Sequence, residues 1–293
     1  MIRTLIAFLA LTAAMVPRVK AQITSNVFER VLKIRVNGGT PHESAATAFT
    51  IDVDGREYLV TAKHVVNELK ESDKIDIYAD GKWLSLAVTL FRCDDPIDIA
   101  VLVPPRQLTT TYDFPFDQTH QQLGQDAYFL GFPFDLQAPG RNVNGLYPLA
   151  LIKRATISGI IALDGRDQTD PLKAKWLLLD GYNNPGFSGG PIVYRDLRKP
   201  GLFYNLLGVV SGFRPDPTPV MNKHAIKSPS DASELAKSQP WRVQQASDGT
   251  FFEYVESGGF VSLNTGIVQG FSIEPAIDLI RQHPIGPQVR QTP

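Results

Sequence analysis

Hydrophobic residues gather in short runs along this sequence. From position 31 onward, runs rich in Val, Ile, Leu, Phe and Tyr are separated by Gly, Pro, Asp and Asn, which predicts many β-strands and few helices. The predicted strands cover residues 31–36, 48–53, 58–61, 74–78, 83–91, 99–103, 127–131, 149–161, 175–179, 191–193 and 206–212. The Asp54-Gly55 pair between two of them is typical of a hairpin turn. This number of strands suits an all-β protein of two packed barrels with a cleft between them.

One region departs from the strand pattern. Residues 214–258 are rich in Ser, Asp and Lys and hold prolines at positions 215, 217, 219, 229 and 240. Because proline lacks the N–H that a sheet requires, this segment cannot be a continuous central strand. We predict a long surface insertion over 214–258.

The C-terminal region predicts a helix followed by a tail. Pro275 stands near the start of a stretch with apolar residues at helical spacing, including Ile277 and Ile280. This pattern predicts a short helix over 274–283 that packs on the second barrel. Residues 284–293 are expected to form a flexible tail.

The N-terminus predicts export. An apolar stretch from Leu5 to Val16 follows Arg3, and Val19-Lys20-Ala21 places small or apolar residues at the two positions that signal peptidase reads. The alternative is an uncleaved membrane anchor, but residues 5–16 rise only about 18 Å as a helix, against a hydrocarbon core of about 30 Å. We therefore expect a signal peptide over 1–21, a mature chain without stable membrane insertion, and a periplasmic or secreted location.

Composition narrows the possible functions. The 293 residues are 43% hydrophobic, enough for a substantial core. Lys and Arg total 29 and Asp and Glu total 30, so no overall positive field favours nucleic acid, and none is expected as a partner. The single Cys93 cannot form an intramolecular disulfide and is expected to be a buried or incidental thiol rather than a nucleophile.

Three short segments carry residues suited to nucleophilic catalysis. Residues 184–191 read Asn-Pro-Gly-Phe-Ser-Gly-Gly-Pro, and the glycines allow a tight turn that presents the Ser188 hydroxyl. Residues 59–66 place His64, a candidate base, at the end of an apolar strand. Asp98 precedes another apolar strand and could orient that base, although Asp94 or Asp95 could take its place.

These three segments resemble the signature blocks of the chymotrypsin-fold, trypsin-like serine proteases, whose catalytic residues follow the same order of His, Asp and Ser. Residues 124–133, 157–161, 208–211 and 266–273 are further similar to segments of the protease domain of the bacterial HtrA-type branch. The PDZ domain of that branch is not expected here. The resemblance implies two six-stranded antiparallel barrels, at about 28–115 and 120–273, within a protease domain over 22–283. The active site would lie in the cleft between the barrels.

The resemblance also implies roles for individual residues. Ser188 would be the nucleophile, His64 the general base and Asp98 its orienting acid, while the N–H groups of Gly186 and Ser188 would form the oxyanion hole. The resemblance assigns substrate binding to Tyr182, Val210, Ser211, Gly266 and Phe271. Since no acidic residue stands at Tyr182, a neutral pocket is expected.

Phe187 occupies the position where zymogen-activated relatives carry an Asp that pairs with a newly cut N-terminus. Phenylalanine cannot form that ion pair, so activation by N-terminal cleavage is not expected. Whether Phe187 permits a preformed oxyanion hole is left open by the sequence.

The expected function is that of an exported serine endopeptidase with a polypeptide substrate and no metal or organic cofactor. His42, His120, His224 and His283 lack the spacing of a zinc site. A catalytically silent binding protein of the same fold and an esterase with the same triad are the alternatives. The sequence does not support any particular oligomer.

Overall fold

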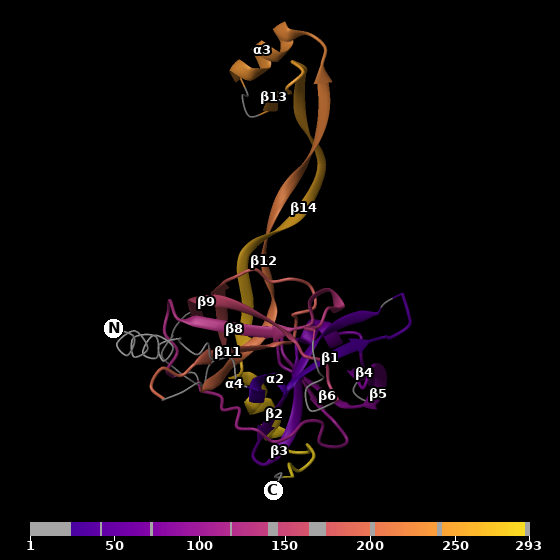
Figure 1. Cartoon of the computed structure of the whole chain (residues 1–293), viewed down its shortest axis with the longest axis vertical. Coiled ribbons are helices and arrows are strands. Elements are labelled where there is room, and N and C mark those ends of the chain that lie inside the picture. The colour runs from indigo at the N-terminus through magenta and orange to yellow at the C-terminus, as the bar shows by residue number, and fades with distance from the viewer. Residues whose placement is uncertain are drawn as a thin grey trace, which may run out of the picture.

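The computed structural model describes residues 25–290, except 42, 71–72, 118, 140–145, 164–173, 200–202 and 239–241. The proposed signal peptide, His42, Pro240 and residues 291–293 lie outside the described residues. The described chain is mainly β-structure in two antiparallel sheets, with a long two-stranded ribbon that projects from one of them (Figure 1). Within these residues, no helix has the length and apolar character needed to cross a membrane.

The first sheet is a barrel in the order β5-β4-β1-β2-β3-β7-β6. Its elements are β1 (Val31–Val36), β2 (Ser44–Val53), β3 (Arg56–Thr61), β4 (Lys74–Ala79), β5 (Lys82–Ala87), β6 (Thr89–Arg92) and β7 (Ala100–Val103), with the 3-10 helix η1 (Lys63–Val66) after β3 and a short helix α2 (Ser25–Phe28) before β1. Only Val88 separates β5 from β6, and this run pairs first with β4 and then with β7. Counted as one bent strand, β5 and β6 close a barrel of six strands. This confirms the prediction of a six-stranded antiparallel barrel.

The second sheet has the order β10-β9-β8-β11-β12-β14-β13. Its elements are β8 (Asp126–Gly131), β9 (Leu151–Ala162), β10 (Lys175–Asp180), β11 (Pro191–Arg195), β12 (Tyr204–Ile226), β13 (Val243–Gln245) and β14 (Phe251–Ser272), with the 3-10 helix η2 (Pro133–Asp135) after β8. A further pairing of β10 with β14 closes six of these strands into a ring and leaves β13 outside. Buried aliphatic and aromatic side chains fill the barrel.

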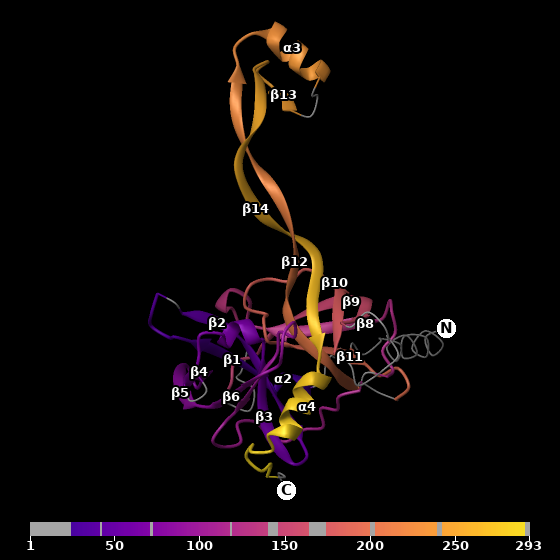
Figure 2. The same cartoon turned by 180° about the vertical axis from the view of Figure 1, so that it is seen from behind.

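Beyond the second barrel, β12 and β14 continue as a ribbon that ends in α3 (Pro229–Ser238) and β13 (Figures 1 and 2). The predicted strand 206–212 is therefore too short, because β12 runs through the prolines at 215, 217 and 219. Alternate residues of a strand direct their N–H groups to the same side, so these three prolines can share the unpaired side of β12. Here β12 has one partner, β14, and proline interrupts no ladder on the other side.

The C-terminal helix α4 (Glu274–Gln282) was predicted to pack on the second barrel, and this was wrong. Its buried residues Ala276, Ile277 and Ile280 join a core cluster that both barrels share, but the strands that the helix itself contacts most are β7 and β2 of the first barrel. His283, directly after the helix, stacks on Phe91 of β6 at 4.1 Å between ring centroids. Helical periodicity identifies an apolar face but not the surface that the face meets, and here that surface belongs largely to the first barrel.

The expectation of a flexible tail fails for residues 284–290. Their backbone follows β3: Glu57 N–H donates to Pro287 O at 3.0 Å and Val289 N–H donates to Gly55 O at 2.9 Å. Arg56 donates to Gly286 O at 2.6 Å. The tail satisfies backbone groups at a sheet edge, which composition alone does not reveal.

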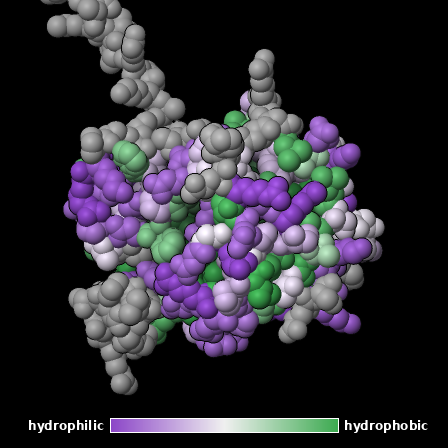
Figure 3. Space-filling model, turned by 90° about the horizontal axis from the view of Figure 1, so that it is seen from below, coloured by the Kyte–Doolittle hydropathy of each residue, from purple (hydrophilic) through white to green (hydrophobic). Residues whose placement is uncertain are grey.

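Seen from below, opposite the ribbon, this end of the molecule mixes hydrophilic and hydrophobic side chains (Figure 3).

Candidate active site

Strand pairing brings His64 and Asp98 together. β3 and β7 are antiparallel, with Thr61 opposite Ala100, so the residues just after β3 lie beside those just before β7. His64 Nδ1 lies 2.7 Å from Asp98 Oδ2, and the His64 backbone N–H donates to Asp98 Oδ1 at 2.8 Å. The alternative acid, Asp95, is instead exposed and pairs with Lys63 Nζ at 2.6 Å. Asp98 is therefore the carboxylate that contacts the histidine.

A third donor holds the Asp98 carboxylate. Ser211 Oγ donates to Asp98 Oδ2 at 2.5 Å. Burial by itself raises the pKa of Asp98, but the hydrogen bonds from His64 and Ser211 and the attraction of the imidazole outweigh burial, so the pKa is lowered. The ionised carboxylate only accepts hydrogen bonds, so it selects the tautomer with the proton on Nδ1 and leaves His64 Nε2 free to act as a base.

The turn that carries Ser188 depends on glycine at close approaches. Gly186 and Gly189 have φ values of 101° and 82°, in the left-handed region that favours glycine. A Cβ on Gly186 would overlap Phe132 O, and one on Gly189 would overlap Thr61 Oγ1 and Thr47 O. The glycine-rich segment therefore fits this turn for steric reasons.

Two backbone hydrogen bonds fasten the turn to β12. Gly189 N–H donates to Val210 O at 2.8 Å, and Val210 N–H donates to Gly190 O at 2.9 Å. The Ser188 hydroxyl donates to Ser211 O at 3.2 Å rather than to His64. Contacts between a nucleophile and its base are often loose before substrate binds, and rotation about one side-chain bond changes the acceptor of this hydroxyl.

The predicted oxyanion donors are available. Neither the Gly186 nor the Ser188 N–H has an acceptor within the described part of the chain. The residue between them, Phe187, is fully buried and packs edge-on against Phe129 at 4.9 Å between ring centroids. Phe187 therefore supports the turn from the core.

Thr47 on β2 is a part of the site that the sequence did not indicate. Its hydroxyl donates to Gly186 O at 2.7 Å and accepts from Phe132 N–H at 3.1 Å. Its backbone N–H donates to Ser188 O at 3.0 Å. Thr47 thus links the first barrel to the nucleophile turn of the second. These contacts join residues far apart in sequence, so a local motif could not have identified them.

The residues predicted to bind substrate separate into two groups. Tyr182 is 57% exposed, Ser211 is half-buried, and Gly266 N–H donates to Asn264 Oδ1 on the same strand, β14. Val210 and Phe271 are instead buried in the hydrophobic core. Both side chains face the barrel interior, as alternate residues of a strand do, and their part in substrate binding stays a prediction.

A hollow of about 390 Å³ lies on the first-barrel side of His64. Two carboxylates, Glu43 and Glu68, are among its lining residues, together with Asn37 and Asn67. The side of the cleft next to the candidate base is therefore polar and acidic.

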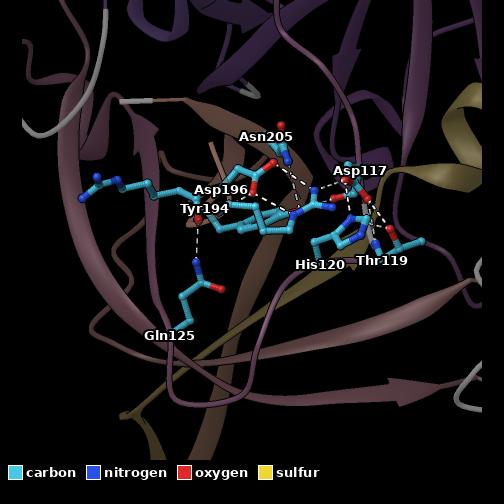
Figure 4. A network of polar contacts seen from close by, with 9 residues as sticks. Asp117, Thr119, His120, Gln125, Tyr194, Asp196 and Asn205 are labelled. Carbon is cyan, nitrogen blue, oxygen red and sulfur yellow. Dashed lines mark hydrogen bonds and ion pairs between the residues drawn. The ribbon is translucent and has the colours of Figure 1, made fainter. Parts of the chain in front are cut away.

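Another histidine, His120, belongs to a polar network away from this site (Figure 4). Its Nδ1 lies 2.7 Å from Asp117 Oδ2 and 2.6 Å from Thr119 Oγ1. Because both partners meet the same ring nitrogen, the ring cannot relay a proton from hydroxyl to carboxylate. Arg198 joins Asp117 to the buried Asp196, at 3.2 Å and 2.9 Å, so the network ties the segment between the barrels to the end of β11.

Among the residues that the structure describes, no cluster of three or more His, Cys, Asp or Glu side chains could hold a metal ion. Cys93 is buried, and burial raises the pKa of its thiol to about 12. A thiol with this pKa is a poor nucleophile at neutral pH.

Residues 46–199, just over half of the chain, match the family of trypsin-like peptidase domains. The chain belongs to this family, and its class is that of the serine-type endopeptidases. No curated protein is significantly similar to the chain.

Several solved proteases are similar in structure. The active form of the Rv3671c protease from M. tuberculosis is 20% identical with a TM-score of 0.45, over 92% of this chain and 86% of that one. The HtrA-type protease AlgW, solved with a decapeptide, is 15% identical with a TM-score of 0.48, over 89% and 68%. A serine endoprotease from Yersinia pestis is 18% identical with a TM-score of 0.43, over 67% and 60%.

Proposed function

We propose that the protein is an exported endopeptidase that cleaves polypeptides through a covalent acyl-enzyme on Ser188. The observation that carries this proposal is that two hydrogen bonds join His64 to Asp98, while the glycine-rich turn of Ser188 has two N–H groups without an acceptor among the described residues. Export rests on the predicted signal peptide over residues 1–21.

In the proposed reaction, Ser188 Oγ attacks the carbonyl carbon of the scissile bond and its proton passes to His64 Nε2. The negative charge that develops on the carbonyl oxygen is bound by the N–H groups of Gly186 and Ser188. The imidazolium then protonates the leaving amine as the C–N bond breaks, which leaves an acyl ester on Ser188. Water, deprotonated by His64, hydrolyses this ester and regenerates the hydroxyl.

Asp98 supports both halves of this reaction. Its lowered pKa keeps the carboxylate ionised at neutral pH, where it orients the imidazole and stabilises the imidazolium. Tyr182, exposed beside the nucleophile segment, offers a neutral surface, so we propose apolar or small side chains next to the cleaved bond.

The test compares the mature wild type with Ser188→Ala and with Ser158→Ala, which removes an exposed serine of β9 outside the site. Each protein is incubated with a fluorophosphonate probe and with unfolded casein. Wild type and Ser158→Ala should be labelled and should cleave casein, while Ser188→Ala should lose labelling and about 10⁶-fold in turnover.

The alternatives give different results in the same experiment. A folded wild type that is neither labelled nor active would favour the silent binding protein. Labelling together with hydrolysis of esters but not of casein or peptide amides would favour the esterase.

A further inference from the structure

Lys153 contacts the segment that leads to the nucleophile. It lies on β9, opposite Phe129 of β8, and its side chain is half-buried. Its ammonium donates to the backbone oxygen of Tyr182 at 2.6 Å and to Asn184 Oδ1. One lysine therefore binds two points of the chain just before Gly186.

Two aromatic rings complete the surroundings of this ammonium. Nζ lies 5.5 Å from the ring centroid of Tyr182 and 5.6 Å from that of Phe187, distances at which a cation is attracted to a ring face. Burial lowers the pKa of Lys153, and its partners in the described part of the chain are oxygens and rings rather than a carboxylate.

The contacts continue into the turn itself. Asn184, held by Lys153 through its side chain, accepts the Phe187 N–H on its backbone oxygen at 3.3 Å. The Phe187 peptide lies between the two N–H groups that the proposed mechanism uses. A path of direct contacts therefore runs from Lys153 through Asn184 and Phe187 to the oxyanion donors.

We propose that Lys153 is a positioning residue whose ammonium holds segment 182–187 in the shape that directs the Gly186 and Ser188 N–H groups into the cleft. This inference rests on the proposed function. It also accounts for Phe187: where zymogen-activated relatives pair an Asp with a new N-terminal ammonium, this chain places an aromatic ring beside the ammonium of an internal lysine. The oxyanion hole then forms on folding, without a cut.

The experiment measures kcat and KM on a peptide amide, and the rate of fluorophosphonate labelling, for wild type and Lys153→Met. The matched control is Arg154→Met, which removes the neighbouring positive charge on the exposed side of the same strand. Lys153→Met should lower kcat and the labelling rate by about 10- to 100-fold with little change in KM, because a charge-assisted anchor of a preorganised site is lost. Arg154→Met should match wild type in both measurements.

A chemical rescue separates positioning from a general loss of folding. The protein is assayed as Lys153→Cys before and after alkylation with 2-bromoethylamine, in which the introduced thiolate displaces bromide and gives a lysine-like side chain. The only native thiol, Cys93, is buried and its pKa is raised to about 12, so it should react slowly. Alkylation should restore kcat at least about 10-fold, whether or not Lys153→Met proves stable.

Each other outcome overturns the inference. Unchanged kcat in a folded Lys153→Met would show that the loop keeps its shape without the ammonium. No recovery after alkylation would show that the loss of activity has a cause other than the missing ammonium. A change confined to KM and to the preferred side chain of the substrate would make Lys153 a substrate-binding group. A wild type that is itself inactive would refute the proposed function first, and the role of Lys153 would fall with it.

Discussion

The Thr47 hydroxyl should matter for both stability and catalysis. Thr47→Val keeps the shape of the side chain but removes the hydroxyl that donates to Gly186 O and accepts from Phe132 N–H, at a fully buried position. A buried polar group left without its partner costs about 1–3 kcal/mol, so the loss of a partner for both Gly186 O and Phe132 N–H should lower the unfolding free energy by about 2–6 kcal/mol. The loss should appear as a lower midpoint in urea at unchanged slope.

Catalysis should fall for a separate reason. The Gly186 carbonyl belongs to the peptide that joins the two oxyanion donors, so its release loosens both, and kcat should fall about 10- to 100-fold. Thr50→Val is the matched control, since Thr50 is equally buried on β2 and its hydroxyl bonds Thr109 Oγ1 at 2.6 Å, away from the site. It should lose stability but not kcat. Equal kcat values for the two folded variants would refute the assigned role of Thr47.

Two further predictions concern stability and pH. Burial raises the pKa of Glu274 from 4.5 to about 7, so this carboxyl takes up a proton on folding between those values and stability falls as pH rises through them. Glu274→Gln should therefore raise the unfolding free energy by up to about 3 kcal/mol near pH 8 and by little near pH 4, and an equal gain at both pH values would contradict this account. Burial alone would raise the pKa of Asp117, but hydrogen bonds from Thr119 and His120 lower it to about 2. The ionised carboxylate therefore stabilises the fold at pH values above its ordinary pKa of 3.8, and this stabilisation is lost as the pH falls towards 2. Asp117→Asn should destabilise the protein at neutral pH and much less near pH 2 in thermal melts, and a constant difference would count against the network.

The barrels and the candidate triad were predictable because their signals are local. Alternating apolar runs and turn residues mark the strands, and His64, Asp98 and Ser188 each lie in a short segment whose neighbours fix the local backbone. Thr47 and Lys153 carry no such signal. Thr47 meets Gly186, 139 positions away, so its role exists only once the two barrels pack together.

The ribbon and the C-terminal helix show two other limits. The prolines at 215, 217 and 219 indicate a break in a strand, yet they are compatible with the outer side of a strand that has one partner. The apolar face of α4 is visible in the sequence, but both barrels offer apolar surfaces and only the path of the chain after β14 selects between them. Val210 and Phe271 were assigned to the pocket from similarity of segments, which does not say to which side of the sheet each side chain points.

The ribbon also connects the candidate site to a distant part of the molecule. Ser211, which bonds Asp98, lies on β12, and the same strand continues without interruption to the tip beside α3. At about 3.3 Å per residue, the part of β12 beyond Phe213 carries the tip about 40 Å from the barrel. The tip is thus far from the candidate site in space, yet it is joined to Ser211 by one strand.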